Sequence, residues 1–318
     1  MPIPAASFED IHSAAERIAP YRHRTPVATS ATLEAETGAQ VFFKCENLQK
    51  VGAFKARGAL NAVLSLSDED ADRGVVTHSS GNHGAALAYA AAIRGIPCTV
   101  VMPEDAPLVK VDAVRGYGSE IEFCHQLERE VASQRVIDRT GATMVHPFNN
   151  AAVIAGQGTA ALELIQDIGD LDIVITPIGG GGLMSGTAIT TRRLLPEARL
   201  IGAEPEEVDD AYRSLRSGEI QPRVPSPNTV ADGLLTALGD LTFATLTWAS
   251  VEVLLVEESD IIAAALFHLH RMKLVVEPSG ATGLAAVRKL GDAARGKRIG
   301  VIISGGNTDF SWLPQENG

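Results

Sequence analysis

The stretch Asp172-Ile173-Val174-Ile175-Thr176-Pro177-Ile178-Gly179-Gly180-Gly181-Gly182 decides the fold of this 318-residue chain. Its apolar part has the composition of a buried β-strand, and four glycines follow that strand directly. A helical pattern begins after the glycines. A strand, a glycine loop and a helix in this order aim backbone N–H groups, and the positive end of the helix dipole, at a bound phosphate. The stretch therefore predicts a phosphate site between a strand and a helix.

Short apolar runs alternate with helical stretches along most of the chain. The expected strands cover residues 75–77, 98–101, 121–123, 173–175, 200–201 and 299–303, and the expected helices include residues 84–94, 108–115 and 127–139. Repeated alternation of this kind predicts an α/β protein whose parallel sheets are covered by helices on both faces. We expect a large domain made of residues 1–66 and 149–318 and a small domain of residues 67–148 inserted into it.

The chain is acidic, with a net charge of −12 and no run of basic residues. Nucleic acid is therefore not expected as a partner, because its binding requires clustered Lys and Arg. No apolar stretch reaches the ~20 residues that span a bilayer, and residues 1–5 lack the basic and apolar parts of a signal peptide. The three cysteines are an odd number without metal-ligand spacing. We expect reduced thiols and a cytoplasmic protein that does not bind membranes.

A second stretch, Val51-Gly52-Ala53-Phe54-Lys55-Ala56-Arg57-Gly58, places one lysine in a small-residue turn that opens a predicted helix. A surface lysine is the ordinary interpretation, but the small neighbours let the backbone approach a ligand closely, and Phe54 can pack against an aromatic ring. A desolvated lysine has a lowered pKa and forms an imine with an aldehyde. A lysine and a phosphate loop on separate units therefore predict a phosphorylated aldehyde held as a Schiff base, which is pyridoxal phosphate.

Polar residues follow two more of the predicted strands. The segment His78-Ser79-Ser80-Gly81-Asn82-His83-Gly84 lies at a helix start, where exposed N–H groups favour an anion such as an amino-acid carboxylate. A simple Ser/Asn helix cap is the alternative, although ligands gather at the carboxyl ends of parallel strands. The segment Ser304-Gly305-Gly306-Asn307 follows the last strand, where Ser304 can hydrogen-bond a ring nitrogen. A plain turn is the alternative for this segment.

Two segments keep further interpretations open. From Ile173 to Glu204 the order of strand, glycines, helix, strand and acidic residue imitates a dinucleotide-binding fingerprint, but the third glycine of that pattern would fall at Ser185. Four contiguous glycines better suit a single phosphate wrapped by backbone. The segment 204–210 packs five carboxylates into seven residues, which suits either a Mg²⁺ or Ca²⁺ site or a solvated acidic loop.

Together these motifs resemble the fold-type II pyridoxal-phosphate enzymes, specifically the serine racemase and serine/threonine dehydratase group. The resemblance runs nearly from end to end, through the expected strand Phe43–Glu46 and the segments Gly52–Asn61, Thr77–Gly84, His146–Phe148, Val153–Thr159, Gly179–Gly182, Glu204–Asp210, Ala231–Gly233 and Ser304–Asn307. It implies two parallel-sheet, three-layer domains of the tryptophan synthase β type and a homodimeric protein.

The resemblance also implies roles for single residues. Lys55 would bind the cofactor as a Schiff base, with Phe54 lying against it. The remaining cofactor-binding residues would be Asn82 at the ring hydroxyl, Ser304 at the ring nitrogen, and Gly179, Gly180, Gly181 and Gly182 at the phosphate. The residues around the substrate carboxylate would be Ser79, Ser80, Gly81, Asn82 and His83, of which Ser80 is the acid/base opposite the lysine in racemases. A divalent cation (Mg²⁺, Ca²⁺ or Mn²⁺) would bind Glu204, Asp210 and the backbone carbonyl of Val208.

The activity implied by the resemblance is dehydration of a small L-β-hydroxy amino acid, of the L-serine or L-threonine type, to a 2-oxo acid and ammonia. Racemisation of serine and dehydration of L-threo-3-hydroxyaspartate to oxaloacetate are alternatives. The second carboxylate of hydroxyaspartate needs a cation or donor, for which His83, Arg129 and Arg57 are candidates. An NAD-dependent oxidoreductase and a non-catalytic ligand-binding protein are the alternatives from other classes.

Overall fold

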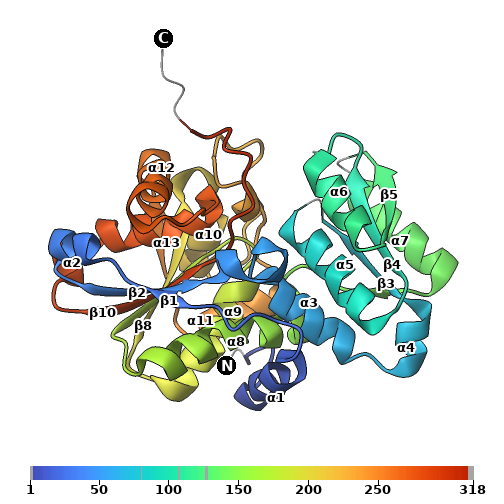
Figure 1. Cartoon of the computed structure of the whole chain (residues 1–318), viewed down its shortest axis with the longest axis horizontal. Helices are drawn as coiled ribbons and strands as arrows, with labels where there is room; N and C mark the ends of the chain where they lie inside the picture. Colours follow the sequence, from blue (N-terminus) through green and yellow to red (C-terminus); the bar gives the residue numbers. More distant parts are fainter. Residues whose placement is uncertain (1–2, 80, 107, 126–127, 314–318) are drawn as a thin grey trace, which may run out of the picture.

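The chain contains two separate sheets, seen side by side in the computed structural model, which describes residues 3–79, 81–106, 108–125 and 128–313 (Figure 1). The larger sheet has the strand order β1-β2-β10-β7-β8-β9 and the smaller one β5-β4-β3-β6. The strands of the larger sheet are β1 (Val27–Ala28), β2 (Gln40–Cys45), β7 (Ile173–Pro177), β8 (Arg199–Pro205), β9 (Glu252–Val256) and β10 (Arg298–Ile303). Those of the smaller sheet are β3 (Val75–His78), β4 (Cys98–Pro103), β5 (Glu120–Cys124) and β6 (Thr143–Met144).

The predicted α/β class with parallel sheets is confirmed. All neighbouring strands of both sheets run parallel, except that the edge strand β1 is antiparallel to β2. Three strands, β1, β6 and β9, have no counterpart among the expected ones. Strands β1 and β6 span only two residues each, too few to carry an apolar run. Strand β9 does carry four consecutive apolar residues, 253–256, and it forms a half-buried edge of the sheet. All strands of the smaller sheet lie inside residues 67–148, and the domain boundaries themselves stay a prediction.

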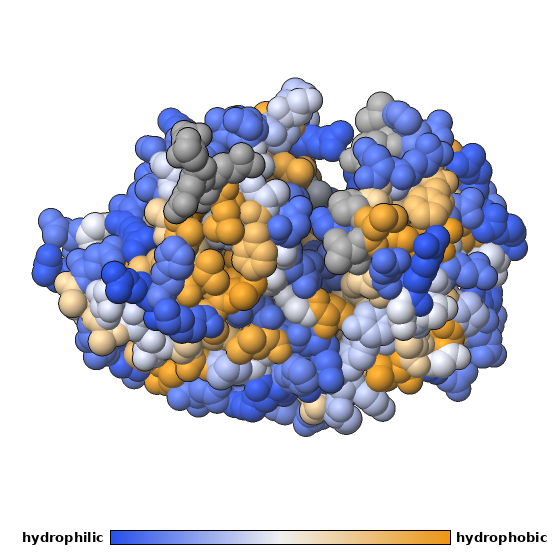
Figure 2. All heavy atoms as spheres, turned by 45° about the horizontal axis from the view of Figure 1, so that its top comes forward, coloured by the Kyte–Doolittle hydropathy of each residue, from blue (hydrophilic) through white to orange (hydrophobic). Residues whose placement is uncertain are grey.

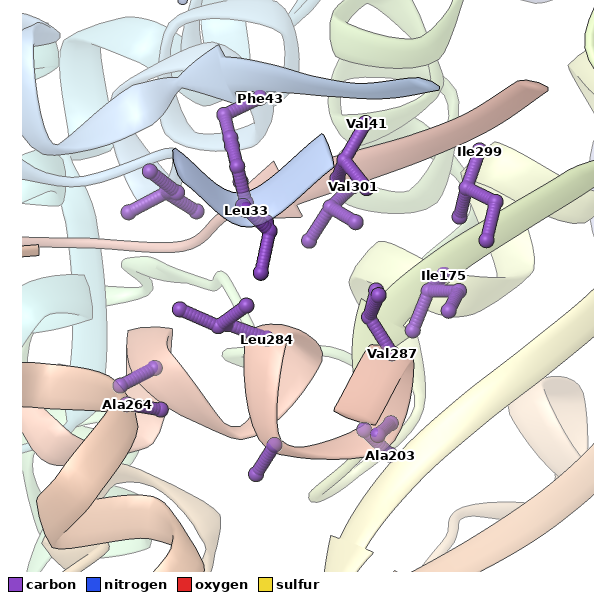
Figure 3. Close-up of a cluster of buried hydrophobic side chains, with 14 of the residues drawn as sticks. Leu33, Val41, Phe43, Ile175, Ala203, Ala264, Leu284, Val287, Ile299 and Val301 are labelled. Carbon is purple, nitrogen blue, oxygen red and sulfur yellow. The ribbon is translucent and has the colours of Figure 1, made fainter. Parts of the chain in front are cut away.

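Helices cover both faces of the larger sheet. On one face lie α12 (Glu258–Phe267) and α13 (Pro278–Lys289), and on the other α8 (Ala151–Ile168), α9 (Gly182–Leu194) and α11 (Asp240–Trp248) (Figure 1). The core of the first face is shown in Figure 3, where Leu284 and Val287 of α13 face Ile175, Ile299 and Val301 of the sheet. Burial of such side chains stabilises the fold by about 1.5–3 kcal/mol each.

The smaller sheet is also the middle of three layers. One face packs on α5 (Asn82–Arg94) and α6 (Leu108–Gly116), with α3 (Lys55–Leu64) lying against α5, and the other face packs on α7 (Arg129–Thr140). Adjacent strand residues point to opposite faces, and accordingly Val75 packs with the first group of helices and Val76 with α7. The remaining helices are α1 (Phe8–Ile18), α2 (Ala31–Thr37), α4 (Asp68–Arg73) and α10 (Asp210–Ser217). No helix within the described ranges is long and apolar enough to cross a membrane.

Helix α3 is held against α8 by a buried ion cluster. The Arg57 side chain is fully buried, and its guanidinium donates to Glu46 from Nε at 2.6 Å and to Glu163 from Nη1 at 2.7 Å. The ammonium of Lys44 lies 2.8 Å from Glu163, and Arg22 lies 2.9 Å from the same carboxylate. The cluster joins β2 and the residue after it to α3 and α8. Burial of these charges is compensated because every carboxylate faces at least one guanidinium.

We expect Arg57→Met to lower the free energy of unfolding by about 3–5 kcal/mol, because the change leaves Glu46 and Glu163 buried without their main cation. Urea unfolding followed by circular dichroism measures this loss. Arg199→Met is the matched control, since the Arg199–Glu252 pair makes two contacts of similar length at the exposed surface and should change the unfolding free energy little. Equal losses in both variants would contradict the prediction.

Candidate active site

A cavity of about 610 Å³ opens between the two sheets. Figure 2 shows the surface hollowed between the two halves of the molecule. The walls contain residues from both halves, among them Lys55, Ser79, Asn82, the glycines 179–182 and Ser304. The fold therefore brings together segments that are far apart in the sequence, as predicted from the carboxyl ends of the strands.

Lys55 is the first residue of α3, and its side chain is half-buried in the cavity wall. Its Nζ donates to the backbone carbonyl of Pro147 at 2.8 Å and lies 5.0 Å from the centre of the Phe54 ring. Loss of water lowers the pKa of Lys55 from 10.5 to about 8, although the carboxylate of Glu277 acts in the opposite direction. A much larger part of this amine is therefore neutral at pH 7 than for an ordinary lysine.

The backbone before Lys55 is attached to the segment after β10. Phe54 N donates to Ser304 O at 2.9 Å, Gly306 N donates to Gly52 O at 2.9 Å, and Ala53 forms a β-bridge with Gly305. This pairing places Lys55 beside the carboxyl end of β10. It also accounts for the small residues of both segments, since a Cβ at residue 305 would lie 3.2 Å from that of Ala53 and 2.5 Å from Glu277 Oε1.

The glycine loop lies between β7 and α9, as predicted. Gly181 is the N-cap of α9 with φ +84°, a backbone conformation that favours glycine, and no side chain caps this helix. A Cβ at residue 180 would lie 2.3 Å from Cδ1 of Phe148, so the loop needs a glycine at this close approach. The uncapped N–H groups at the start of a buried helix are the donors that a phosphate requires. The loop thus fits the phosphate of a cofactor bound at Lys55.

The predicted carboxylate loop lines the same cavity, with Ser79, Gly81, Asn82 and His83 among the lining residues. Gly81 is the N-cap of α5, and no side chain caps this helix either. Ser80 lies outside the described residues. The Nε2 atom of His83 faces Val145 O at 3.0 Å, and burial lowers the pKa of His83 to about 3. The imidazole is therefore neutral and donates to this carbonyl, so His83 supplies no positive charge to a substrate.

Asn82 is held in place by two side chains. Its Nδ2 donates to both carboxylate oxygens of Glu277 at 3.1 and 3.2 Å, and its Oδ1 accepts from Asn307 Nδ2 at 2.9 Å. Glu277 lines the cavity, and burial raises its pKa to about 7. No motif in the sequence points to Glu277. The one available signal is its position before Pro278 at the start of α13, a pattern that is equally common at helix starts without any ligand.

The charged residues at the cavity differ in part from those expected. Arg57 is absent from the lining because its guanidinium is held in the ion cluster behind α3, so it cannot bind a substrate carboxylate. Arg129 does line the cavity, together with Lys110 and Arg223. Lys110 Nζ lies 3.1 Å from Asp232 Oδ2, an ion pair that connects α6 of the small sheet with the turn before α11.

The acidic segment 204–210 lies away from the cavity lining. Glu204 lies near the end of β8 and Asp210 begins α10, and both side chains are almost fully buried. Burial raises their pKa values to about 8 and about 6. Glu204 accepts from the backbone N–H groups of Ala211 at 2.8 Å and Tyr212 at 2.9 Å, whereas the Oδ2 atom of Asp210 is buried without a hydrogen-bond partner.

The acidic segment supplies some, but not all, of the ligands that a divalent cation needs. Two buried carboxylates and one unpaired oxygen are suitable ligands for a hard cation. In the described ranges, however, no group of three or more His, Cys, Asp or Glu side chains is arranged to hold a metal, so a cation here would also need backbone oxygen or water. The alternative of a wholly solvated acidic loop is wrong for Glu204 and Asp210, and it holds for the exposed Glu206 and Glu207.

The lysine, the uncapped glycine loop and the shared cavity agree with the comparisons to known proteins. The model of the pyridoxal-phosphate-dependent enzyme family matches residues 18–305. The chain belongs to this family. Its membership removes the dinucleotide alternative for the glycine run and confirms the fold-type II resemblance.

Three relatives are similar along nearly the whole chain. The serine racemase of Dictyostelium discoideum is 50% identical over 315 residues, covering 98% of this chain and 97% of the relative. The β-hydroxyaspartate dehydratase of Paracoccus denitrificans (strain Pd 1222) is 50% identical over 310 residues, covering 97% and 98%. The crystal structure of a T.th. threonine deaminase superimposes with a TM-score of 0.91 at 42% identity, covering 96% and 99%.

We expect the Lys55 amine of the cofactor-free protein to titrate near pH 8 rather than near 10.5. The fraction of Lys55 labelled by acetic anhydride at several pH values, read by mass spectrometry, measures this midpoint. Glu277→Gln should lower the midpoint further, because it removes the carboxylate that favours the ammonium form. A midpoint near 10.5, or a rise in the Glu277→Gln variant, would show that desolvation does not control this amine.

Proposed function

We propose that this member of the pyridoxal-phosphate family is an ammonia-lyase that dehydrates a small L-β-hydroxy amino acid to a 2-oxo acid and ammonia. The observation that carries the proposal is the Lys55 amine, which is desolvated in a cavity that also contains the glycine loop and the predicted carboxylate loop. The relatives named β-hydroxyaspartate dehydratase and threonine deaminase support the reaction class.

The side chains around Lys55 suit this chemistry. The glycines 179–182 would hold the phosphate, and Asn82 and Ser304 would bind polar atoms of the ring. When bound, the cofactor withdraws electrons from the substrate Cα and makes its proton acidic. The neutral amine of Lys55 removes that proton, while the N–H groups at the start of α5 hold the substrate carboxylate. The β-hydroxyl leaves with a proton as water, and the unsaturated amine that is released hydrolyses to the 2-oxo acid and ammonia.

Ser304 favours loss of the β-hydroxyl over reactions that need a long-lived negative charge on the cofactor ring. A serine hydroxyl at the ring nitrogen would not keep a proton there as an aspartate would, because the hydroxyl is neutral and supplies no negative charge to stabilise the protonated ring. Less negative charge is then stabilised on the ring, and prompt loss of the β-hydroxyl becomes competitive. Ser304 is well placed for this role, since its own backbone carbonyl accepts from Phe54 N next to the lysine.

The lining cations support hydroxyaspartate as a substrate beside L-serine and L-threonine. Arg129 and Arg223 border the cavity, and a second carboxylate on the substrate would be attracted to these cations. A neutral hydroxy amino acid needs no such group. Lys110 also lines the cavity, where it is paired with Asp232. Serine racemisation is the second candidate, supported by the 50% identical serine racemase. It would use the hydroxyl of Ser80 to return a proton to the face opposite Lys55.

We further propose that a divalent cation binds at Glu204, Asp210 and the carbonyl of Val208, and that the protein is a cytoplasmic homodimer. The buried, unpaired oxygen of Asp210 supports the cation. The three buried, reduced cysteines support a reducing compartment, and the homodimer rests on the family resemblance.

Purified protein with Mg²⁺ should release ammonia and 2-oxo acid from at least one of L-serine, L-threonine and L-threo-3-hydroxyaspartate. Coupled dehydrogenase assays measure both products, and chiral chromatography measures D-serine. Lys55→Ala should lose at least ~10³-fold in kcat because it removes the base. Lys297→Ala, which changes an exposed lysine just before β10, should keep full activity. Ser80→Ala should lose racemisation and retain dehydration of the L isomer. Full turnover by Lys55→Ala would overturn the mechanism.

Mg²⁺ should raise the melting temperature of the protein, because a cation bound only by the native state stabilises it. Differential scanning fluorimetry with Mg²⁺ and after EDTA measures this shift. Asp210→Asn should remove it, whereas Asp209→Asn should retain it, because Asp209 is already paired with Arg213 at 2.8 Å. An undiminished shift in Asp210→Asn would place the cation elsewhere.

A further inference from the structure

The Lys55 amine has a partner whose direction is fixed by a neighbouring side chain. Its Nζ donates to Pro147 O at 2.8 Å. Pro147 lies in the turn 146–149 between β6 and α8, far from Lys55 in the sequence. A backbone carbonyl accepts from an amine only when its peptide plane is turned toward it, so something must fix this plane.

His146 fixes it. The Nδ1 atom of His146 accepts from Asn149 N at 2.9 Å and from Phe148 N at 3.3 Å. The peptide between Pro147 and Phe148 is trans, and in a trans peptide the N–H and C=O groups point in opposite directions. Because the N–H of Phe148 points at the imidazole, the carbonyl of Pro147 must point away from it, toward the cavity and Lys55.

The rest of the turn is held from both sides. The Phe148 ring fills the space that Gly180 leaves open and meets the His146 ring edge-on at 4.6 Å. The side chain of Asn149 accepts from Leu241 N at 3.0 Å and donates to Asp240 at 2.6 Å. These contacts hold the turn as a whole, and the acceptor on His146 orients the peptide between Pro147 and Phe148, whose carbonyl accepts from Lys55.

We propose that His146 is a positioning residue for Lys55: by accepting two backbone N–H groups, its imidazole aims the Pro147 carbonyl at the lysine amine. The inference rests on the proposed use of Lys55 as the base. The carbonyl holds Nζ within the cavity whenever the amine is free, and it stabilises the ammonium form once Lys55 has taken the substrate proton. The imidazole itself touches neither the amine nor the reacting atoms.

The protonation state of His146 agrees with this role. Burial, with the neighbouring His78 and Lys55, lowers the pKa of His146 to about 4, so its Nδ1 is free to accept at neutral pH and its proton lies on Nε2. The titratable groups that face Lys55 are Glu277 before α13, His83 of α5 and His146 itself. Both imidazoles stay neutral near pH 8, so a change in the Lys55 midpoint caused by a His146 variant does not come from a lost positive charge.

Two substitutions separate the acceptor of His146 from its packing. His146→Phe keeps a ring against Phe148 and lacks the acceptor. His146→Asn loses the ring, and its Oδ1 can accept from the N–H groups two and three residues on, as in an Asx turn. His268→Ala is the control for general destabilisation, because it removes an imidazole that is more deeply buried than that of His146 and does not line the cavity.

The experiment measures the Lys55 labelling midpoint of each full-length variant after the cofactor is removed with hydroxylamine, and kcat and KM of the cofactor-loaded enzyme. We expect His146→Phe to lower the midpoint by about one pH unit, because the ammonium loses a charge-assisted hydrogen bond. The kcat of this variant should fall roughly ten- to hundredfold with little change in KM. His146→Asn should restore most of the wild-type labelling midpoint and most of the wild-type kcat. His268→Ala should lower the melting temperature without moving the labelling midpoint.

The proposal would be overturned in favour of a packing role if His146→Asn lowered the labelling midpoint and kcat more than His146→Phe does. An unchanged labelling midpoint in His146→Phe would overturn it as well. If His146→Phe does not fold, His146→Ala replaces it and is judged against His146→Asn by the same two measurements. Labelling does not depend on the substrate. Absence of turnover in the wild-type protein would therefore defeat the proposed function while the midpoints still decide the role of His146.

Discussion

The burial of Arg57 is the constraint on which the position of Lys55 depends. A guanidinium without water is tolerated only when carboxylates surround it, and here Glu46 and Glu163 do so from two different elements, with Lys44 and Arg22 balancing their charge. Arg57 is two residues after Lys55, and in a helix this spacing turns the two side chains to nearly opposite sides. The cluster therefore fixes the back of α3 to β2 and α8, so that the first turn of α3 presents Lys55 to the cavity.

Three separate restraints thus hold Lys55 in place. The ion cluster fixes the helix behind it, the pairing of residues 52–54 with residues 304–306 fixes its backbone, and the Pro147 carbonyl receives its amine. Each restraint comes from a different part of the chain, and two of them are made by backbone atoms. Such a lysine has little freedom to leave its position in the cavity wall, and this preorganisation is what the proposed double role of its amine, binding an aldehyde and removing a proton, would require.

The parts of the site that could be predicted are those that depend on local backbone chemistry. The glycine run after β7 approaches Phe148 so closely that a side chain at residue 180 would clash with its ring. The need for this close approach is therefore visible in the sequence as a run of glycines. Lys55 stands out for the same reason, among small residues. Glu277 and His146 could not be assigned roles in this way. A glutamate before proline and a histidine before a loop occur in many structures, and their significance here arises only because Asn82 and Lys55 are brought to them. Arg57 was placed wrongly among the substrate-binding candidates, since a sequence does not show on which side of α3 its carboxylate partners lie.

The α/β class, the order of the main strands along the chain and the family follow from the sequence alone, because apolar periodicity and glycine positions follow directly from backbone geometry. The same local patterns single out Lys55 and the glycines 179–182 as candidates for a cofactor site. Only the tertiary structure decided which charges are buried, which cations reach the cavity, and which carbonyl receives the lysine. These properties depend on distances between residues that are far apart along the chain, and on the exclusion of water from the space between them, and neither quantity is encoded in any local pattern.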